Sequence, residues 1–192
     1  MKIGILALQG DFAEHAAVLR GLGAAVTEVR LPGHLDGLDG LIIPGGESTT
    51  IGKLAVTCGL IDPLREFGMR KPVWGTCAGA IFLSKDVRRS QPLLNLMDIQ
   101  VERNAFGRQV DSFEADLDVP ELKAVTGRNG LYHAVFIRAP IIQSVGRDAK
   151  VLAETADNKI VAAQQGHLLA TSFHPELTPD ARFHEYFLSL AD

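Results

Sequence analysis

The sequence is poor in cysteine, in runs of positive charge and in long hydrophobic segments, and each scarcity excludes a class of protein. Its 192 residues include two cysteines, Cys58 and Cys77, which are too few for a disulfide framework or a zinc-ligand cluster. The formal net charge is -4, and no run of Lys or Arg indicates a nucleic-acid partner. No apolar segment approaches the length that crosses a bilayer, so we expect no membrane partner.

The first residues do not read as a targeting segment either. Residues 1–8 are too short for a secretory signal, and Gln9-Gly10-Asp11 follows them in place of a cleavage site. A hydrophobic fraction of 46% and a charged fraction of 22% are ordinary for a soluble globular protein. We therefore expect a cytoplasmic protein. Because no repeat or linker divides the chain, we expect a single domain over residues 1–192.

Short apolar runs alternate with helical patterns along the first half of the chain. Residues 3–8 form an apolar run typical of a strand buried on both faces, and Asp11 can cap a helix over residues 12–22. Further strands are expected over residues 25–31, 41–43 and 72–75, and short helices over residues 54–58 and 61–67. A strand, a helix and a strand in this order predict a parallel sheet.

The second half is less regular, and several of its strands are expected to be antiparallel. Candidate strands cover residues 110–117, 132–137, 151–155, 160–164 and 168–173, with Asn158 suited to a tight hairpin between two of them. Residues 84–91 and 120–130 are polar and are expected to form loops. A last helix is expected over residues 179–191, where Phe183 and Phe187 lie on one side.

The stretch Gly75-Thr76-Cys77-Ala78-Gly79 is the first candidate for chemistry. Small residues on both sides of Cys77 permit a sharp turn from strand to helix, which exposes a nucleophile as Gly-x-Ser-x-Gly does in serine hydrolases. The positive end of a helix favours the thiolate form of such a cysteine. The alternative is a structural role, in which Cys77 is a small buried residue beside packing glycines. Cys58 has no comparable turn and is expected to be structural.

Two other segments could complete a site. In residues 44–50, Gly45 and Gly46 let backbone amides approach a ligand and Ser48 can cap a helix, although a flexible loop fits this pattern too. Near the C-terminus, His174 and Glu176 lie two apart in an extended segment, so they share a face. A carboxylate beside a histidine holds it as a base, although a solvated strand end is equally compatible.

The remaining histidines lack partners at metal-ligand spacing, and we expect surface or packing roles for them. They are His15, His34, His133, His167 and His184. On the helix expected over residues 12–22, His15 is assigned to the solvent side.

Blocks of sequence along nearly the whole chain resemble the glutaminase subunits of pyridoxal 5′-phosphate synthase, which are class I, triad glutamine amidotransferases. The blocks are Leu8-Gln9-Gly10 and residues 44–50, 75–79, 101–104, 106–114, 136–140 and 172–177. The cysteine and His-x-Glu blocks are shared by the whole class. Pro-Gly-Gly-Glu-Ser-Thr-Thr and Arg-Asn-x-Phe-Gly-Arg-Gln are more specific to this family. Residues 121–132 depart from it in being longer and more polar.

The resemblance implies a three-layer α/β sandwich around a mostly parallel sheet, and hydrolysis of L-glutamine without a metal or cofactor. It assigns Cys77 as nucleophile, His174 as proton carrier and Glu176 as the group that orients His174. It further assigns the amides of Gly46 and Ala78 to an oxyanion hole. The residues that it assigns to the glutamine site are Gly46, Glu47, Ser48, Arg103, Ile137 and Arg138.

The resemblance also implies a partner, a (β/α)8-barrel synthase subunit that receives the ammonia in a hetero-oligomeric complex, with Gln9 and Gly10 near the interface. Two alternatives stay open. A ThiJ/PfpI-type cysteine hydrolase has a similar cysteine turn, but its histidine typically follows the cysteine, where this chain has Ala78. A regulatory subunit that binds glutamine without turnover is the other.

Overall fold

A curled central sheet organises the fold. In the computed structural model, which describes residues 1–87, 90–103 and 112–191, ten strands of the described chain belong to this sheet, in the order β2-β1-β3-β4-β12-β11-β9-β6-β5, with β10 paired to β11. Its strands are β1 (Lys2–Leu6), β2 (Ala25–Val29), β3 (Gly40–Ile43), β4 (Val73–Thr76), β5 (Ser84–Asp86), β6 (Met97–Glu102), β9 (Ile141–Val145), β10 (Lys150–Glu154), β11 (Ile160–Gln165) and β12 (Leu168–Thr171). Strands β7 (Ser112–Leu117) and β8 (Tyr132–Ile137) form a separate antiparallel pair.

The sheet is parallel around its centre and antiparallel toward one side. Strands β2, β1, β3, β4 and β12 are parallel neighbours, whereas β11 is antiparallel to β12, β10 and β9. Asn158 has a φ of 60° in the turn between β10 and β11, as expected of a tight hairpin. The predicted mostly parallel sheet with antiparallel strands in the C-terminal half is confirmed.

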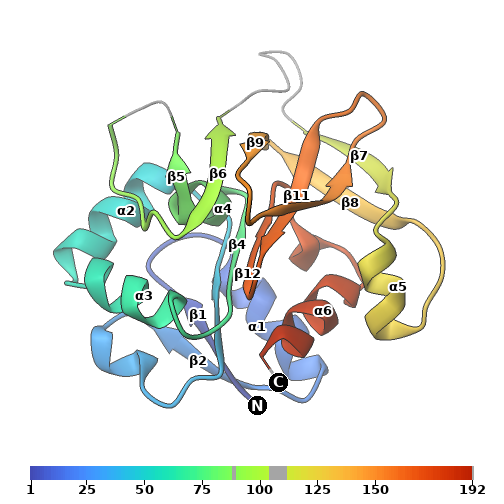
Figure 1. Ribbon diagram of the computed structural model, residues 1–192. Coiled ribbons are helices and arrows are strands. Elements are labelled where there is room, and N and C mark those ends of the chain that lie inside the picture. The colour runs from blue at the N-terminus through green and yellow to red at the C-terminus, as the bar shows by residue number, and fades with distance from the viewer. Residues whose placement is uncertain (88–89, 104–111, 192) are drawn as a thin grey trace.

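Helices cover both faces of the sheet (Figure 1). They are α1 (Phe12–Gly21), α2 (Ser48–Thr57), α3 (Ile61–Gly68), α4 (Ala78–Leu83), α5 (Pro120–Thr126) and α6 (Arg182–Leu190), with short 3-10 turns η1 (Pro32–Leu35) and η2 (Pro175–Leu177). None of the helices in the described parts of the chain is both long and apolar enough to cross a membrane.

Alternate residues of the central strands feed two separate hydrophobic cores, because side chains along a strand point to opposite faces. Leu41 and Val73 pack in the core beneath α2, α3 and α4, whereas Ile42 and Trp74 pack in the core with α1 and α6. Two cores on opposite faces of one sheet make the predicted three-layer sandwich, which is therefore confirmed.

The structure corrects several expectations about the less regular segments. Residues 120–126 form α5 where a loop is predicted, because Pro120 occupies the first turn, where a missing N–H costs nothing, and Gly127 ends the helix at a φ of 68°. Residues 84–86 form β5, paired with β6, and neither β6 nor β9 was anticipated. The predictions for residues 104–111 lie outside the described residues.

The helix after the Gly-Gly loop begins earlier than predicted and is capped by a different residue. Glu47 is the N-cap of α2, and its carboxylate accepts hydrogen bonds from the backbone N–H groups of Thr49 (3.1 Å) and Thr50 (2.7 Å). Ser48, the predicted cap, is instead the first helical residue. A carboxylate here also meets the positive end of the helix.

Loss of this cap should destabilise the protein in a pH-dependent way. Burial raises the pKa of Glu47, but hydrogen bonds from Thr50 and Thr49 outweigh it and lower the pKa from 4.5 to about 2. A lowered folded-state pKa means that the stabilisation is fully present above about pH 4.5 and is lost as the pH falls toward 2.

We expect Glu47→Ala to reduce the free energy of unfolding by about 1 kcal/mol, the usual value of a helix cap. Urea unfolding should give the same difference at pH 7 and pH 5, and a smaller difference at about pH 3, where the stabilisation is being lost. Glu14→Ala, which removes an exposed carboxylate from the first turn of α1, is the control and should change stability less. A Glu47→Ala protein as stable as the wild type would contradict the cap.

Candidate active site

Cys77 lies at a strained turn between β4 and α4. Its backbone has a φ of 47° and a ψ of −105°, a region that residues with a side chain rarely occupy. Glycines on both sides make the turn possible. A Cβ on Gly79 would collide with the carbonyl oxygen of Ile43, and one on Gly75 would lie 2.5 Å from the carbonyl of Gly79. The Cys77 N–H donates to the carbonyl of Thr171 (2.8 Å), which anchors the turn to the neighbouring strand.

The segment after β12 brings a histidine to this cysteine. Thr76 and Thr171 are register partners in the parallel pair β4–β12, so the residues that follow both strands emerge at one edge of the sheet. His174 is held there by its N–H, which donates to the carbonyl of Val135 (2.8 Å). Its side chain lines the same pocket as Cys77, and the two groups interact electrostatically, while its Nδ1 lies 2.7 Å from Oε1 of Glu176. Cys77, His174 and Glu176 therefore follow one another in a row, with His174 in the middle.

Burial and charge set the protonation of this row. Burial lowers the pKa of His174, but hydrogen bonds and charge interactions with Cys77 and Glu176 outweigh it and raise the pKa to about 10. Burial raises the pKa of Glu176, while the hydrogen bond with His174 opposes that rise. The arrangement therefore favours a protonated imidazole between the sulfur and the carboxylate.

A second carboxylate faces the same histidine. Asp11 occupies the N-cap position of α1, as predicted, but its side chain makes no cap hydrogen bond, and its Oδ2 lies 3.5 Å from Nδ1 of His174. Asp11, His174 and Glu176 have potential ligand atoms within 4.8 Å of one another. Both carboxylates face the same ring nitrogen, so the cluster is hydrogen-bonded and charge-paired as it stands.

The Gly-Gly loop packs directly against the loop that follows β1. The Asp11 N–H donates to the carbonyl of Gly45 (3.2 Å), and in a planar trans peptide the N–H of Gly46 points the opposite way. The Gln9 side-chain oxygen accepts from the N–H of Glu47 (2.7 Å). A Cβ on Gly10 would collide with the Gly45 carbonyl, so only glycine permits this contact.

An ion pair lines the other side of the cleft. Nη2 of Arg103 lies 3.0 Å from Oε1 of Glu47, and Nη1 donates to Oγ1 of Thr49 (3.1 Å). Gln91 adds a contact to the same guanidinium (Nη1 to Oε1, 3.4 Å). The pair places one negative and one positive group side by side at the start of α2.

These elements enclose a pocket of about 420 Å³. Its lining contains Gln9, Gly10, Asp11, Gly46, Glu47, Ser48, Cys77, Ala78, Ile81, Arg103, Ile137, Arg138, Pro140, His174 and Leu177. The structure thus brings all the sequence-predicted site residues together, with Glu176 buried behind His174. Ala78 is the first residue of α4, so its N–H has no acceptor within the helix. Arg138 has a φ of 45°, which marks a tight bend after β8.

One sequence prediction about the surroundings of the site is wrong. His15 is fully buried, where solvent exposure was expected, and its Nε2 lies 3.3 Å from Oε2 of Glu176. Its Nδ1 lies 3.0 Å from Nε2 of His184, which is also fully buried. Phe12 and Leu19 stand three residues before and four residues after His15, so helical spacing alone was a signal for its burial.

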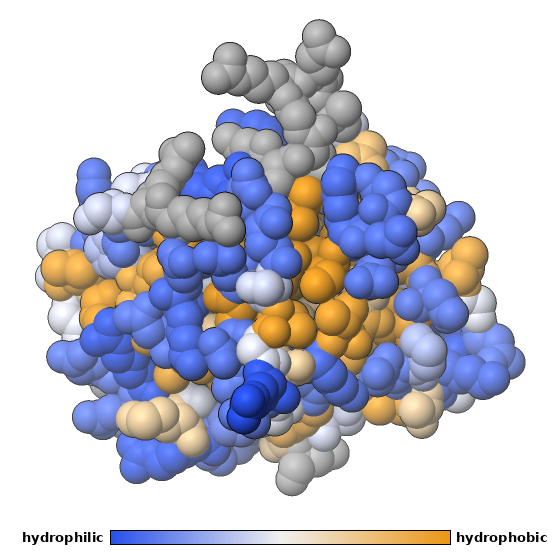
Figure 2. Space-filling view, turned by 45° about the horizontal axis from the view of Figure 1, so that its top comes forward, coloured by the Kyte–Doolittle hydropathy of each residue, from blue (hydrophilic) through white to orange (hydrophobic). Residues whose placement is uncertain are grey.

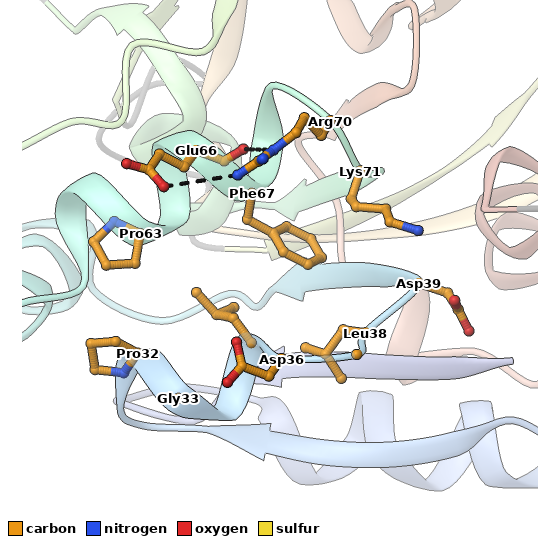
Figure 3. Close-up of a pocket in the computed structure, with 12 residues that line it drawn as sticks. Pro32, Gly33, Asp36, Leu38, Asp39, Pro63, Glu66, Phe67, Arg70 and Lys71 are labelled. Atoms are coloured by element: carbon orange, nitrogen blue, oxygen red, sulfur yellow. Dashed lines mark hydrogen bonds and ion pairs between the residues drawn. The ribbon is translucent and has the colours of Figure 1, made fainter.

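A larger cavity, of about 690 Å³, lies at the other end of the central strands (Figure 3). Phe67 of α3 points toward Leu38 across it, and an ion pair between Glu66 and Arg70 (3.8 Å) lies on its rim. No cysteine or histidine lines this cavity. The smaller pocket, which holds Cys77 and His174, is the better candidate for chemistry.

Known proteins are similar to this chain along nearly its full length. The model of the SNO glutamine amidotransferase family matches residues 5–191. Two relatives, each a pyridoxal 5′-phosphate synthase subunit PdxT, come from Herpetosiphon aurantiacus (56% identical over 195 residues) and Roseiflexus sp. (57% over 196 residues), with 99% of this chain and 100% of each relative covered. A crystal structure of a glutamine amidotransferase has a TM-score of 0.91 at 51% identity, covering 98% of both chains. The chain therefore belongs to the SNO glutamine amidotransferase family.

Proposed function

We propose that this protein hydrolyses L-glutamine to L-glutamate and ammonia, and that the ammonia passes to a synthase that makes pyridoxal 5′-phosphate. The observation that carries the proposal is that Cys77 and His174 line one pocket, with Glu176 hydrogen-bonded to His174 from behind. The relatives support the second half of the proposal, since both are named as subunits of pyridoxal 5′-phosphate synthase. Family membership argues against a ThiJ/PfpI-type hydrolase.

In the proposed reaction, the sulfur of Cys77 attacks the side-chain carboxamide carbon of glutamine. A tetrahedral oxyanion forms and collapses to a γ-glutamyl thioester as ammonia leaves, with His174 donating the proton that ammonia needs. Water, deprotonated by His174, then cleaves the thioester and releases glutamate. Glu176 keeps Nδ1 of His174 protonated, so that Nε2 serves the reaction.

The amides of Gly46 and Ala78 are proposed to bind the oxyanion. Removing one such donor typically costs about 3 kcal/mol of barrier. Ala78 suits the role because it begins α4, and Gly46 because its peptide is held by the Asp11 contact on its other side.

The ion pair of Glu47 and Arg103 matches the other end of the substrate. Free glutamine carries an ammonium and a carboxylate on one carbon, and the pocket offers a carboxylate and a guanidinium 3.0 Å apart. We assign Arg103 to the α-carboxylate, since its planar guanidinium binds carboxylates with two parallel hydrogen bonds. Ser48, Ile137 and Arg138 complete the proposed glutamine site.

Ammonia released into water at neutral pH becomes ammonium, which is not a nucleophile, so direct transfer to a partner is favoured. The proposed partner is a (β/α)8-barrel synthase subunit in a hetero-oligomeric complex. Ile137 and Leu177 line the pocket with 37% and 45% of their surface exposed. Figure 2 shows hydrophobic surface gathered in the middle of one face, with hydrophilic surface around it. We propose that the partner docks around this pocket, with Gln9 and Gly10 near the interface.

Cys77→Ala should abolish glutamate production and leave binding of the synthase subunit intact, because it removes only the nucleophile. The measurement is glutamate release from glutamine by the complex, together with co-elution of the two chains. Cys58→Ala removes the second free thiol, at the end of α2, and should retain activity. A Cys77→Ala complex that still forms glutamate at the wild-type rate would refute the mechanism. A wild-type complex that binds glutamine but forms no glutamate would identify a regulatory subunit instead.

Arg103→Lys should raise the KM for glutamine with little change in kcat. A lysine keeps the charge but loses the paired donors, so binding weakens equally in the ground state and the transition state. Steady-state kinetics of the complex measures both constants. Arg128→Lys, in an exposed ion pair with Glu185, is the matched control. An unchanged KM would show that Arg103 does not hold the substrate.

The free protein should hydrolyse glutamine much more slowly than the complex, because unproductive release of ammonia would waste substrate. Glutaminase assays of the purified chain, with and without the synthase subunit, measure the difference. Equal rates in the two assays would contradict dependence on the partner, without bearing on the role of Cys77.

A further inference from the structure

A buried pair of histidines stands behind the catalytic row. His15 comes from α1 and His184 from α6, two helices that pack on the same face of the sheet. His15 Nε2 reaches Oε2 of Glu176 at 3.3 Å, while the other carboxylate oxygen, Oε1, lies 2.7 Å from His174. One carboxylate therefore has an imidazole on each of its oxygens.

We propose that His15 is a positioning residue for the catalytic row, holding Glu176 through a proton on its Nε2, and that His184 fixes His15 in the tautomer that carries this proton. The inference rests on the proposed function, in which Glu176 orients His174.

The position of the proton on His15 follows from its neighbours. A lone pair on Nε2 would face the negative charge of Glu176 at 3.3 Å, so the proton belongs on this nitrogen. There it is shared with Oγ1 of Thr76, which lies 3.2 Å away. Nδ1 is then the acceptor of a hydrogen bond that the Nε2–H of His184 donates (3.0 Å).

Burial keeps both histidines neutral, so each holds a single ring proton. It lowers the pKa of His15 well below its ordinary value, helped by electrostatic interactions with His184 and His174. It lowers the pKa of His184 to about 3. A neutral donor stabilises the ionised form of Glu176 and, unlike a second imidazolium, adds no charge that would repel His174.

Glu176 needs such a donor because it is deeply enclosed. In the described parts of the chain, Oε2 has no well-aligned hydrogen bond, and Nε2 of the neutral His15, 3.3 Å away, is the polar atom that faces it. A buried carboxylate oxygen without a donor is costly and free to turn. The edge contacts of Trp74 with His15 (5.8 Å between ring centres) and with His184 (5.0 Å) hold both rings in place.

Other titratable groups also face this carboxylate and enter its pH dependence. His174 lies on the same segment, Asp11 at the start of α1 and Tyr132 on β8. Asp11 and Tyr132 are expected to act equally in the wild type and in variants at position 15. A difference in pH dependence between the wild type and these variants therefore reports on His15.

The main experiment compares His15→Leu with His15→Gln in the complex. His15→Leu should lower kcat roughly tenfold or more, the effect of losing one hydrogen bond to a charged group, with KM unchanged. Since the reaction needs Glu176 ionised and loss of the donor raises its pKa, the acid limb of the kcat profile should move to higher pH, by about one unit. His15→Gln keeps an N–H near the place of Nε2. It should therefore restore most of the lost kcat and return the acid limb close to its wild-type position.

His167→Leu is the matched control. The His167 side chain contacts the carbonyl of Gly68 (2.8 Å) and makes no hydrogen bond with the catalytic row. This variant should leave kcat and the acid limb unchanged. A folded His15→Leu protein with wild-type kcat and acid limb would overturn the proposal, as would a His15→Gln protein as impaired as His15→Leu.

A second measurement does not depend on turnover or on the variants folding. Nitrogen NMR of the wild-type protein labelled at histidine should show His15 protonated on Nε2 and neutral throughout the range where the protein is folded. Protonation on Nδ1 would overturn the proposal. A wild-type complex that forms no glutamate would instead defeat the proposed function, while this spectrum would still decide the tautomer.

Discussion

The backbone turn at Cys77 is the constraint on which the rest of the structure depends. A residue held in a sparsely populated region of φ and ψ costs on the order of 1–3 kcal/mol and persists only where its surroundings fix it. Here β4 lies between β3 and β12, so strands on both sides hold the turn. The same constraint explains the glycines: the turn brings Gly79 so close to Ile43 that any side chain would displace β3. The sulfur thus emerges where the ends of these strands meet.

Much of the fold was predictable because its central strands are continuous apolar runs. Such runs, separated by helices, admit little besides a parallel sheet, and β1, β3 and β4 follow the prediction within about two residues at each end. One error came from proline, which disrupts a helix interior but is favourable in the first turn of a helix. Residues 120–130 were expected to form a loop, yet Pro120 is favourable at the first turn of α5. Strands β5, β6 and β9 take their structure from the strands beside them, which local sequence does not reveal.

The residues with a local sequence pattern in the candidate site were also predictable, but the residues that pack behind them were not. Cys77, the Gly-Gly loop and the His-x-Glu segment each carry a local pattern, and the parallel sheet brings them together. His15 and Asp11 were assigned by residue type, one to solvent and the other to a helix cap. Both turn toward the histidine and carboxylate near the C-terminus, more than 150 residues away in the sequence. Only the packing of α1 beside the segment after β12 creates these contacts.

The single tryptophan of the chain has a consequence of its own. Trp74 lies fully buried on β4, three residues before Cys77, with its ring against His15 and His184 and its indole N–H bonded to Oγ1 of Thr171 (3.1 Å). Its fluorescence therefore comes from one defined place, at the junction of the strand that presents the sulfur and the helices behind it. The protein carries an intrinsic optical probe of that junction, which needs neither a label nor a substrate.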